Sequence, residues 1–170
     1  MTATENKGLG ADPIERNWMR FSVVLLVAFA ATVTVAGFFM GFTVPGADQE
    51  VDPQTVTQEG PFSEPGLREV AEGKYDAYIV AQTFSYTPGL LEIPVGAEVT
   101  FYVTSIDVQH GFNIRDTNIN MQIVPGQVSK LTHTFEEPGE FPFICTEYCG
   151  SQHHAMFGTI RVVSGTGAEG

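Results

Sequence analysis

The sequence predicts a mainly β domain, a sandwich or a barrel, that follows a single transmembrane helix. The first observation behind this prediction is a run of 24 residues without charge, 21–44, which is long enough to cross an apolar layer of about 30 Å. The second is a series of short runs rich in β-forming residues that begins near Tyr75 and is interrupted by glycine and proline turns. No internal repeat is visible, and a length of 170 residues allows one domain beyond the helix.

The N-terminal part divides into a polar segment, 1–20, and the predicted transmembrane helix, 21–44. Three basic residues precede the apolar run, and none follows it before Arg68. An excess of basic residues marks the cytoplasmic side of a span, so we expect a single-pass protein of the cell membrane with a cytoplasmic N-terminus and an extracytoplasmic remainder. A cleavable signal peptide is the alternative, but its apolar core is only about 7–15 residues long and 45–48 is a poor cleavage site.

Residues 45–74 are expected to form an extended linker, because prolines recur among acidic and polar residues and no apolar period supports a helix. The domain proper is expected over residues 75–164. It is followed by a tail of small and polar residues, 165–170, which we expect to be flexible.

Strand-like runs fill this domain. Val99, Phe101 and Val103 alternate with polar or less apolar neighbours, which is typical of a half-buried strand. The predicted runs cover residues 76–84, 90–94, 98–105, 128–135, 140–144 and 158–163.

The only two cysteines of the chain, Cys145 and Cys149, lie in a twelve-residue stretch that also contains His153 and Met156. Thiolate, thioether and imidazole groups suit copper, zinc or an iron–sulfur cluster. The spacing does not fit the paired ligands of a zinc ribbon or the ligand set of a cluster. Histidine, cysteine and methionine together are typical of a blue-copper site, but one copper of that kind does not need a second cysteine.

Two thiolates on one short loop could instead bridge two copper ions, each of which would need one imidazole and one weak ligand. His153 and Met156 supply one of each. His110 is the best candidate for the second imidazole, because a loop histidine at a strand end can reach another loop at the same end of a barrel. The backbone carbonyl of Glu147 is placed to be the second weak ligand. A disulfide between the cysteines is the alternative, although it would leave the other donors unexplained.

The cluster resembles the dinuclear copper centre, CuA, of cytochrome c oxidase subunit II. The family pattern is a distant His and then Cys-x-Glu-x-Cys-x-x-x-His-x-x-Met, matched here at His110, Cys145, Glu147, Cys149, His153 and Met156. The likeness extends from about Tyr75 to Val163 and is greatest to the B-type (ba-type haem) oxidases. It implies that the β domain is a cupredoxin-like Greek-key β-barrel.

The resemblance also implies a function, the electron-entry subunit of a terminal haem–copper oxidase. Such a subunit accepts electrons at CuA from a soluble donor, such as cytochrome c or a small blue-copper protein, and passes them to haem in subunit I. Oxygen is reduced to water there, so no catalytic residue is expected in this chain. Family members take electrons in through an aromatic side chain near the site, and Phe84 or Tyr86 could serve here unless both are core residues. In related oxidases an acidic side chain at the position of Glu147 helps to hold magnesium against subunit I.

Two other functions share these features. A membrane nitric oxide reductase can carry the same copper motif on its small subunit, and a copper electron-transfer protein can act without an oxidase partner. An enzyme that acts alone is not expected, because the chain offers no acid–base or nucleophile set apart from the metal cluster.

The charge distribution narrows the partners further. Residues 1–44 are balanced, so the whole net charge of −12 lies beyond them. This excludes nucleic acid as a partner. The acidic surface either steers a basic donor to the site or reflects a high-salt habitat. The acids are spread through the domain, which favours the second interpretation.

Overall fold

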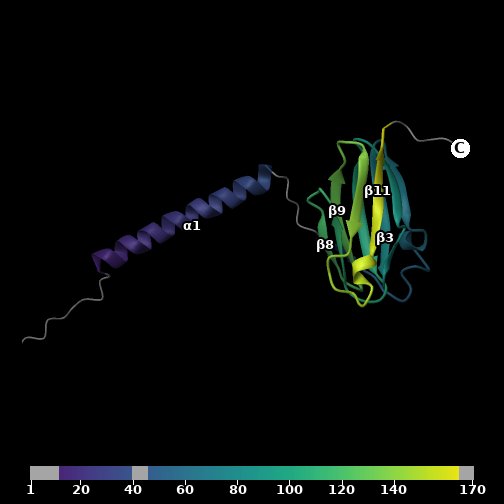
Figure 1. Cartoon of the computed structure of the whole chain (residues 1–170), viewed down its shortest axis with the longest axis horizontal. Coiled ribbons are helices and arrows are strands. Elements are labelled where there is room, and N and C mark those ends of the chain that lie inside the picture. Colours follow the sequence, from purple (N-terminus) through teal and green to yellow (C-terminus); the bar gives the residue numbers. More distant parts are fainter. Residues whose placement is uncertain (1–11, 40–45, 165–170) are drawn as a thin grey trace, which may run out of the picture. The chain divides into compact units, whose positions relative to one another are not determined.

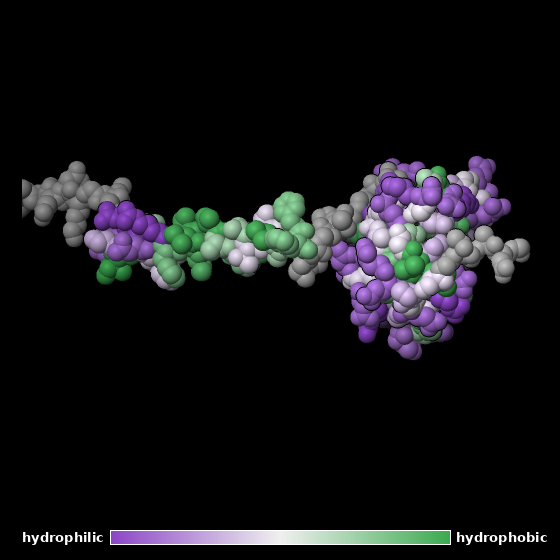
Figure 2. Space-filling view, turned by 90° about the horizontal axis from the view of Figure 1, so that it is seen from above, coloured by the Kyte–Doolittle hydropathy of each residue, from purple (hydrophilic) through white to green (hydrophobic). Residues whose placement is uncertain are grey.

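The computed structural model describes residues 12–39 and 46–164, which form one helix and one β domain (Figure 1). Helix α1 (Pro13–Phe39) is long and apolar enough to cross a membrane, and none of its residues is buried in the structure. Its surface is largely hydrophobic beyond a hydrophilic first part (Figure 2). The single apolar helix agrees with the prediction.

Helix α1 begins earlier than the predicted span, which started at residue 21. The side chain of Asp12 accepts a hydrogen bond from the backbone N–H of Ile14 at 2.8 Å, and Pro13 follows as the first helical residue. Asp before Pro is a typical helix start, because the carboxylate satisfies a free N–H and proline needs none. The last residues of the predicted span, 40–44, lie outside the described residues.

The β domain consists of two packed sheets, and each sheet joins strands that are neighbours in the sequence with strands that lie far apart in it, as in a Greek key. The first sheet contains β1 (Gly46–Glu50), β2 (Gly66–Ala71), β3 (Lys74–Gln82), β4 (Ser85–Thr87), β6 (Glu98–Ser105) and β9 (Gln127–Thr134), in the order β1-β9-β6-β3-β2 with β4 also paired to β3. The second sheet contains β5 (Leu90–Pro94), β7 (His110–Ile114), β8 (Asn120–Ile123), β10 (Gly139–Ile144) and β11 (Phe157–Val163), in the order β5-β11-β10-β7-β8. This is the predicted mainly β, cupredoxin-like architecture.

The inner faces of the two sheets enclose the core. Fully buried phenylalanines from both sheets meet there, with Phe112 of β7 tilted against Phe143 of β10 at 5.0 Å between ring centroids and against Phe101 of β6 at 6.0 Å. Side chains alternate between this core and the outer faces, as strand geometry requires. The packed core fixes the ends of the strands, beside which the candidate metal ligands lie.

The predicted strands agree well with the structure. Predicted runs 90–94 and 98–105 coincide with β5 and β6, and the other four differ from β3, β9, β10 and β11 by at most two residues at either end. The five remaining strands, β1, β2, β4, β7 and β8, were not predicted. We expected His110 in a loop, but it is the first residue of β7.

The segment 45–74 differs from the extended linker that its composition suggested. Strands β1 and β2 belong to the first sheet, and the chain between them, including the 3₁₀ turn η1 (Pro61–Ser63), covers the outer face of that sheet. Phe62 and Val56 are buried there against Val80 and Val128. The predicted tail, 165–170, lies outside the described residues.

Candidate metal centre

The connection between β10 and β11 carries most of the candidate ligands. These strands pair antiparallel, with Ile144 opposite Phe157, so Cys145 and Met156 flank the last rung of the ladder. The backbone N–H of Cys145 donates to the carbonyl of Met156 at 3.2 Å and extends the pairing by one step. The loop thus closes on itself, and the 3₁₀ turn η2 (His153–Ala155) lies within it at one end of the domain (Figure 1).

His110 reaches this loop because β7 pairs with β10. Gly111, the next residue, makes the close approach possible. A Cβ atom at this position would lie 2.7 Å from the backbone nitrogen of Thr146 and 2.9 Å from that of Glu147, distances that no side chain tolerates. Only glycine lets β7 lie against the backbone between the two cysteines.

The donor atoms lie close to one another. The two cysteine sulfurs are 3.8 Å apart. The Sγ of Cys145 is 3.9 Å from Nδ1 of His110 and 3.1 Å from the carbonyl oxygen of Glu147. The Sγ of Cys149 is 3.6 Å from both Nδ1 of His153 and Sδ of Met156. The structure therefore brings together all six predicted donor groups.

These separations suit a metal. Donors that bind one tetrahedral ion at about 2.0–2.3 Å lie about 3.3–3.8 Å apart. The S–S, S–N and S–Sδ separations fall in or next to that range, and thiolate, imidazole and thioether are the ligand types that copper takes. The residues present therefore fit a copper site.

Burial shapes the chemistry of the loop. His110, both cysteines and Met156 are buried, and His153 is partly exposed. Both cysteines are free thiols, which the sulfur separation requires because a disulfide bond is only about 2.05 Å long. Burial raises the pKa of the Cys149 thiol, and the neighbouring Cys145 raises it further. A metal must displace this proton, so binding releases it.

Asp107 holds the other side of the His110 ring, where Nε2 lies 2.8 Å from Oδ1 of the carboxylate. Partial burial alone would raise the pKa of Asp107. Hydrogen bonds from His110, from the backbone N–H groups of Thr83 and Val108 and from the Thr83 hydroxyl outweigh that effect and hold the pKa well below its usual range. The carboxylate is therefore charged.

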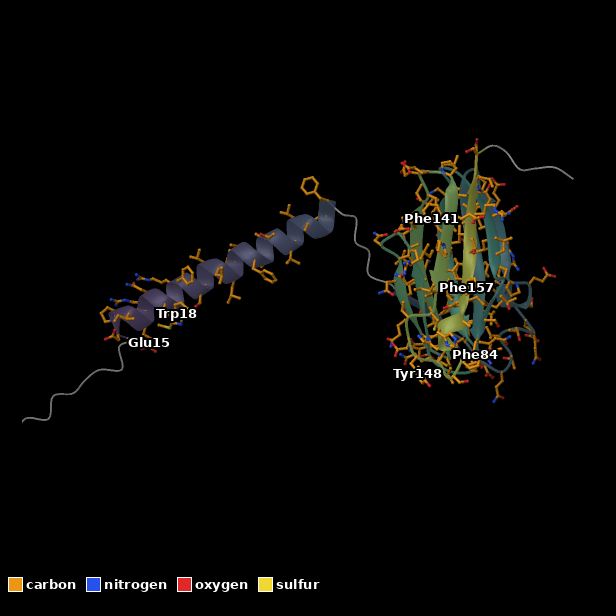
Figure 3. All side chains as sticks on the ribbon, in the orientation of Figure 1. Glu15, Trp18, Phe84, Phe141, Tyr148 and Phe157 are labelled. Atoms are coloured by element: carbon orange, nitrogen blue, oxygen red, sulfur yellow. The ribbon has the colours of Figure 1, made fainter. Side chains whose placement is uncertain are left out.

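The aromatic candidates differ in exposure. Tyr86 is buried in the core, where its hydroxyl donates to the carbonyl of Gly111, and burial raises its pKa well above the usual range. Phe84 is partly exposed and packs against Gly150. Phe84 and the exposed Tyr148 lie at the same end of the domain, away from Phe141 (Figure 3). Of the two candidates for electron entry, only Phe84 is accessible at the surface of the domain.

The side chain of Glu147 is exposed. It lines a pocket of about 370 Å³ with neighbours that are mostly polar: Gly111, Asn120, Met121, Gln122 and Thr146.

Sequence reasoning missed two residues that shape the centre, Asp107 and Gly111. An acid three residues before a candidate histidine ligand is a usable pattern, because ligating imidazoles commonly donate their second N–H to a carboxylate. A glycine directly after that histidine indicates a close approach of two backbones.

Comparison with known proteins agrees with this geometry. The family model for the periplasmic domain of cytochrome c oxidase subunit II matches residues 70–163. Two relatives from Thermus thermophilus, both cytochrome c oxidase subunit 2, are 44% identical over 87% of this chain and 90% of theirs, and 46% identical over 76% and 97%. These relatives agree with the expected likeness to the B-type oxidases.

A solved structure supports the same assignment. One chain of a haem–copper terminal oxidase dimer superposes with a TM-score of 0.74 at 30% identity, over 88% of this chain and 99% of that one. The match therefore covers nearly the whole of that oxidase chain. With the cysteine and histidine site and the N-terminal apolar helix, these comparisons show that the chain belongs to the family of cytochrome c oxidase subunit II, with a CuA-type copper site and a place beside subunit I in a haem–copper oxidase.

Proposed function

We propose that the centre holds two copper ions, bridged by the two cysteine thiolates. The ligands would be His110, Cys145, the carbonyl of Glu147, Cys149, His153 and Met156. The observation that carries this proposal is the duplication of donor kinds, because each sulfur has one imidazole nitrogen and one weaker donor beside it. A single ion with four ligands would leave two of the six donor groups without a purpose.

Copper bound here would supply one-electron chemistry, through which an electron from a donor outside the membrane would reach haem in subunit I. The residues of this chain keep the donor atoms in place. The Cys145 N–H bond to Met156 and the Met156 N–H bond to His153, at 3.2 Å each, tie the loop to the end of the β10–β11 ladder. Burial excludes water from the sulfurs. A centre held in this way needs little rearrangement when an electron arrives, so transfer is fast.

The test is to load the full chain with copper in detergent and to record metal content, optical spectra and EPR. We expect about two coppers per chain and the seven-line hyperfine pattern of an electron shared by two copper nuclei, the signature the family resemblance implies. One copper with an ordinary blue-copper spectrum would refute the bridged pair. A chain that takes up no copper would refute the whole centre.

We further propose that the electron donor docks at the copper end of the domain through uncharged contacts. Residues 83–91, 107–114 and 145–157 supply the loops and strand starts at this end. Their only Asp, Glu, Lys or Arg residues are Glu147 and Asp107, and the carboxylate of Asp107 is already bound to His110 and Thr83. Val108 and Tyr148 are exposed there, and Phe84 is partly so. The acidic residues lie mainly elsewhere, so they do not form a steering ring around the site.

The ionic strength dependence of the reaction between donor and oxidase complex tests this docking. We expect the bimolecular rate to change little with salt, since uncharged contacts are not screened. We also expect Phe84→Ala to slow the reaction while the copper spectrum stays unchanged, with Phe141→Ala at the other end as the matched control. A steep fall of the rate with salt would refute docking through uncharged contacts. Unchanged kinetics of Phe84→Ala would refute electron entry at Phe84.

The pocket beside Glu147 is our proposed magnesium site at the boundary with subunit I. Its carboxylate, amide and hydroxyl oxygens are the ligands that hard cations prefer. Replacement of magnesium by manganese in the complex gives an EPR signal that reports the site. Glu147→Gln should abolish that signal, whereas Glu92→Gln on β5 should leave it intact; a signal that survives Glu147→Gln would remove the proposal.

We propose that α1 is a retained, single-pass anchor with its N-terminal end in the cytoplasm. The basic residues Arg16 and Arg20 in its first turns and the acidic residues after the span support this orientation. Protease treatment of intact cells should degrade the β domain. If the domain is protected until the cells are lysed, the orientation is the opposite of the proposed one.

A further inference from the structure

Asp107 connects His110 to a turn that lies far from it in the sequence. Its two carboxylate oxygens face different elements. Oδ1 lies 2.8 Å from Nε2 of His110 and accepts the backbone N–H of Val108 at 2.6 Å. Oδ2 accepts the backbone N–H and the hydroxyl of Thr83, at 2.7 and 2.8 Å. Thr83 belongs to the turn between β3 and β4, and 24 residues separate it from Asp107.

This contact decides which nitrogen of His110 can bind a metal. The ring is fully buried, so water does not compete for its nitrogens. A carboxylate that faces Nε2 accepts a hydrogen bond from it and therefore keeps the proton on that nitrogen. Nδ1, which faces Cys145, is left with a free lone pair.

The same turn touches the cysteine loop at a second point. The ring of Phe84, next to Thr83, lies against Gly150, where a Cβ atom would come within 2.9 Å of Cε1 of that ring. Gly150 directly follows Cys149. The turn thus contacts the β7 ligand through Asp107 and the cysteine loop through Phe84.

We propose that Asp107 is a positioning residue of the copper centre, which orients His110 for metal binding and joins it to the Thr83–Phe84 turn as one rigid unit. The inference rests on the proposed copper centre. It follows that the surface where a donor would meet Phe84 and the buried ligand on β7 are held in a fixed relation by one carboxylate.

Asparagine cannot take over this role. Its amide offers one oxygen acceptor and one NH₂ donor group in place of two acceptor oxygens. Whichever way the amide is turned, the NH₂ group faces either the N–H of His110 or the N–H and hydroxyl of Thr83. One of the two connections is therefore lost in Asp107→Asn although the shape of the side chain is kept.

The experiment compares the full chain with its Asp107→Asn variant in detergent. Copper affinity is measured by competition with a chelator, and the reduction potential and EPR hyperfine pattern are recorded on loaded protein. We expect copper affinity to fall about 10–100-fold, as is usual when the partner of a ligating histidine is removed. The potential should rise, because a negative charge beside the oxidised centre is lost, and the hyperfine pattern should change. Glu92→Gln, which removes an exposed carboxylate far from the loop, is the control and should change none of these.

Thr83→Val keeps the test decisive if Asp107→Asn fails to fold. It removes only the hydroxyl that donates to Oδ2 and preserves the backbone N–H, so its effect should have the same direction and be smaller. The role of Asp107 would be overturned if Asp107→Asn had the copper affinity, reduction potential and hyperfine pattern of the unmodified chain. If Asp107→Asn does not fold, the same result for Thr83→Val would overturn it. An unmodified chain that bound no copper would instead refute the centre itself, so the two failures are distinguishable.

Discussion

Replacement of Gly111 by alanine tests whether the copper site depends on the close approach of β7 to the cysteine loop. The added Cβ would lie 2.7 Å from the backbone nitrogen of Thr146 and 2.9 Å from that of Glu147, where ordinary contact begins at 3.4 Å. The shortfalls are thus 0.7 and 0.5 Å. Both neighbours are backbone atoms and cannot rotate away, so β7 and the loop must separate by about this amount.

Such overpacking costs about 1–3 kcal/mol of unfolding free energy. For a domain of this size, about 4 °C of Tm corresponds to 1 kcal/mol, so we expect the metal-free Gly111→Ala variant to melt about 4–12 °C lower. Copper binding should weaken as well, because Thr146 and Glu147 lie between the two cysteines and the carbonyl of Glu147 is one of the proposed donors.

Thermal unfolding followed by circular dichroism, with and without copper, measures both effects. Gly139→Ala on β10 is the matched control, since its Cβ would meet only the ring of Phe141 at 3.6 Å. It should melt within a few degrees of the unmodified chain and bind copper normally. If Gly111→Ala melts and binds copper as the control does, the claim that only glycine fits against the loop is wrong.

Three further predictions concern stability. Burial lowers the pKa of His133, so the unfolded chain takes up the proton more readily and the free energy of unfolding should fall as the pH drops below about 6.5. Urea titrations at several pH values should show that this free energy depends less on pH in His133→Gln. An equal pH dependence in the variant and the unmodified chain would exclude this histidine as a cause. Tyr86→Phe should lower the free energy of unfolding by about 1–3 kcal/mol, because the buried carbonyl of Gly111 loses its donor; an unchanged guanidinium midpoint would show that another group replaces the hydroxyl. Removal of copper by a chelator should lower Tm, since free copper at about 100 times its Kd contributes about 2.7 kcal/mol, and a Tm independent of copper would mean that the folded chain does not bind it preferentially.

The strands that the sequence predicts are those whose own side chains decide their structure. In the first part of β6, the buried residues Val99, Phe101 and Val103 alternate with partly buried neighbours, and turn residues bound the strand. By contrast, β8 has only four residues and β4 only three. Such short segments become strands because a partner offers a free edge, and the partner cannot be identified from composition.

The candidate metal centre was predictable because five of its six proposed donors lie in one twelve-residue stretch. The distant His110 was found from its place beside a strand end, although it begins a strand itself. The role of Asp107 was not predictable, because it depends on the proximity of the β3–β4 turn. In the sequence Asp107 is one acid among many.

The chain between β1 and β2 has a practical consequence for producing the copper domain without its helix. Tyr78 and Tyr102 stack at 5.0 Å on the outer face of the first sheet, and Phe62 meets Tyr78 edge-on at 5.3 Å. A fragment that begins at residue 75, where the strand pattern of the sequence starts, would lack Phe62 and β2 and would expose both tyrosines and Val80. It would present a bare apolar patch and an open edge of β3, a combination that promotes aggregation. A soluble fragment should therefore begin ahead of β1, and an insoluble product from the shorter one would reveal nothing about the copper site.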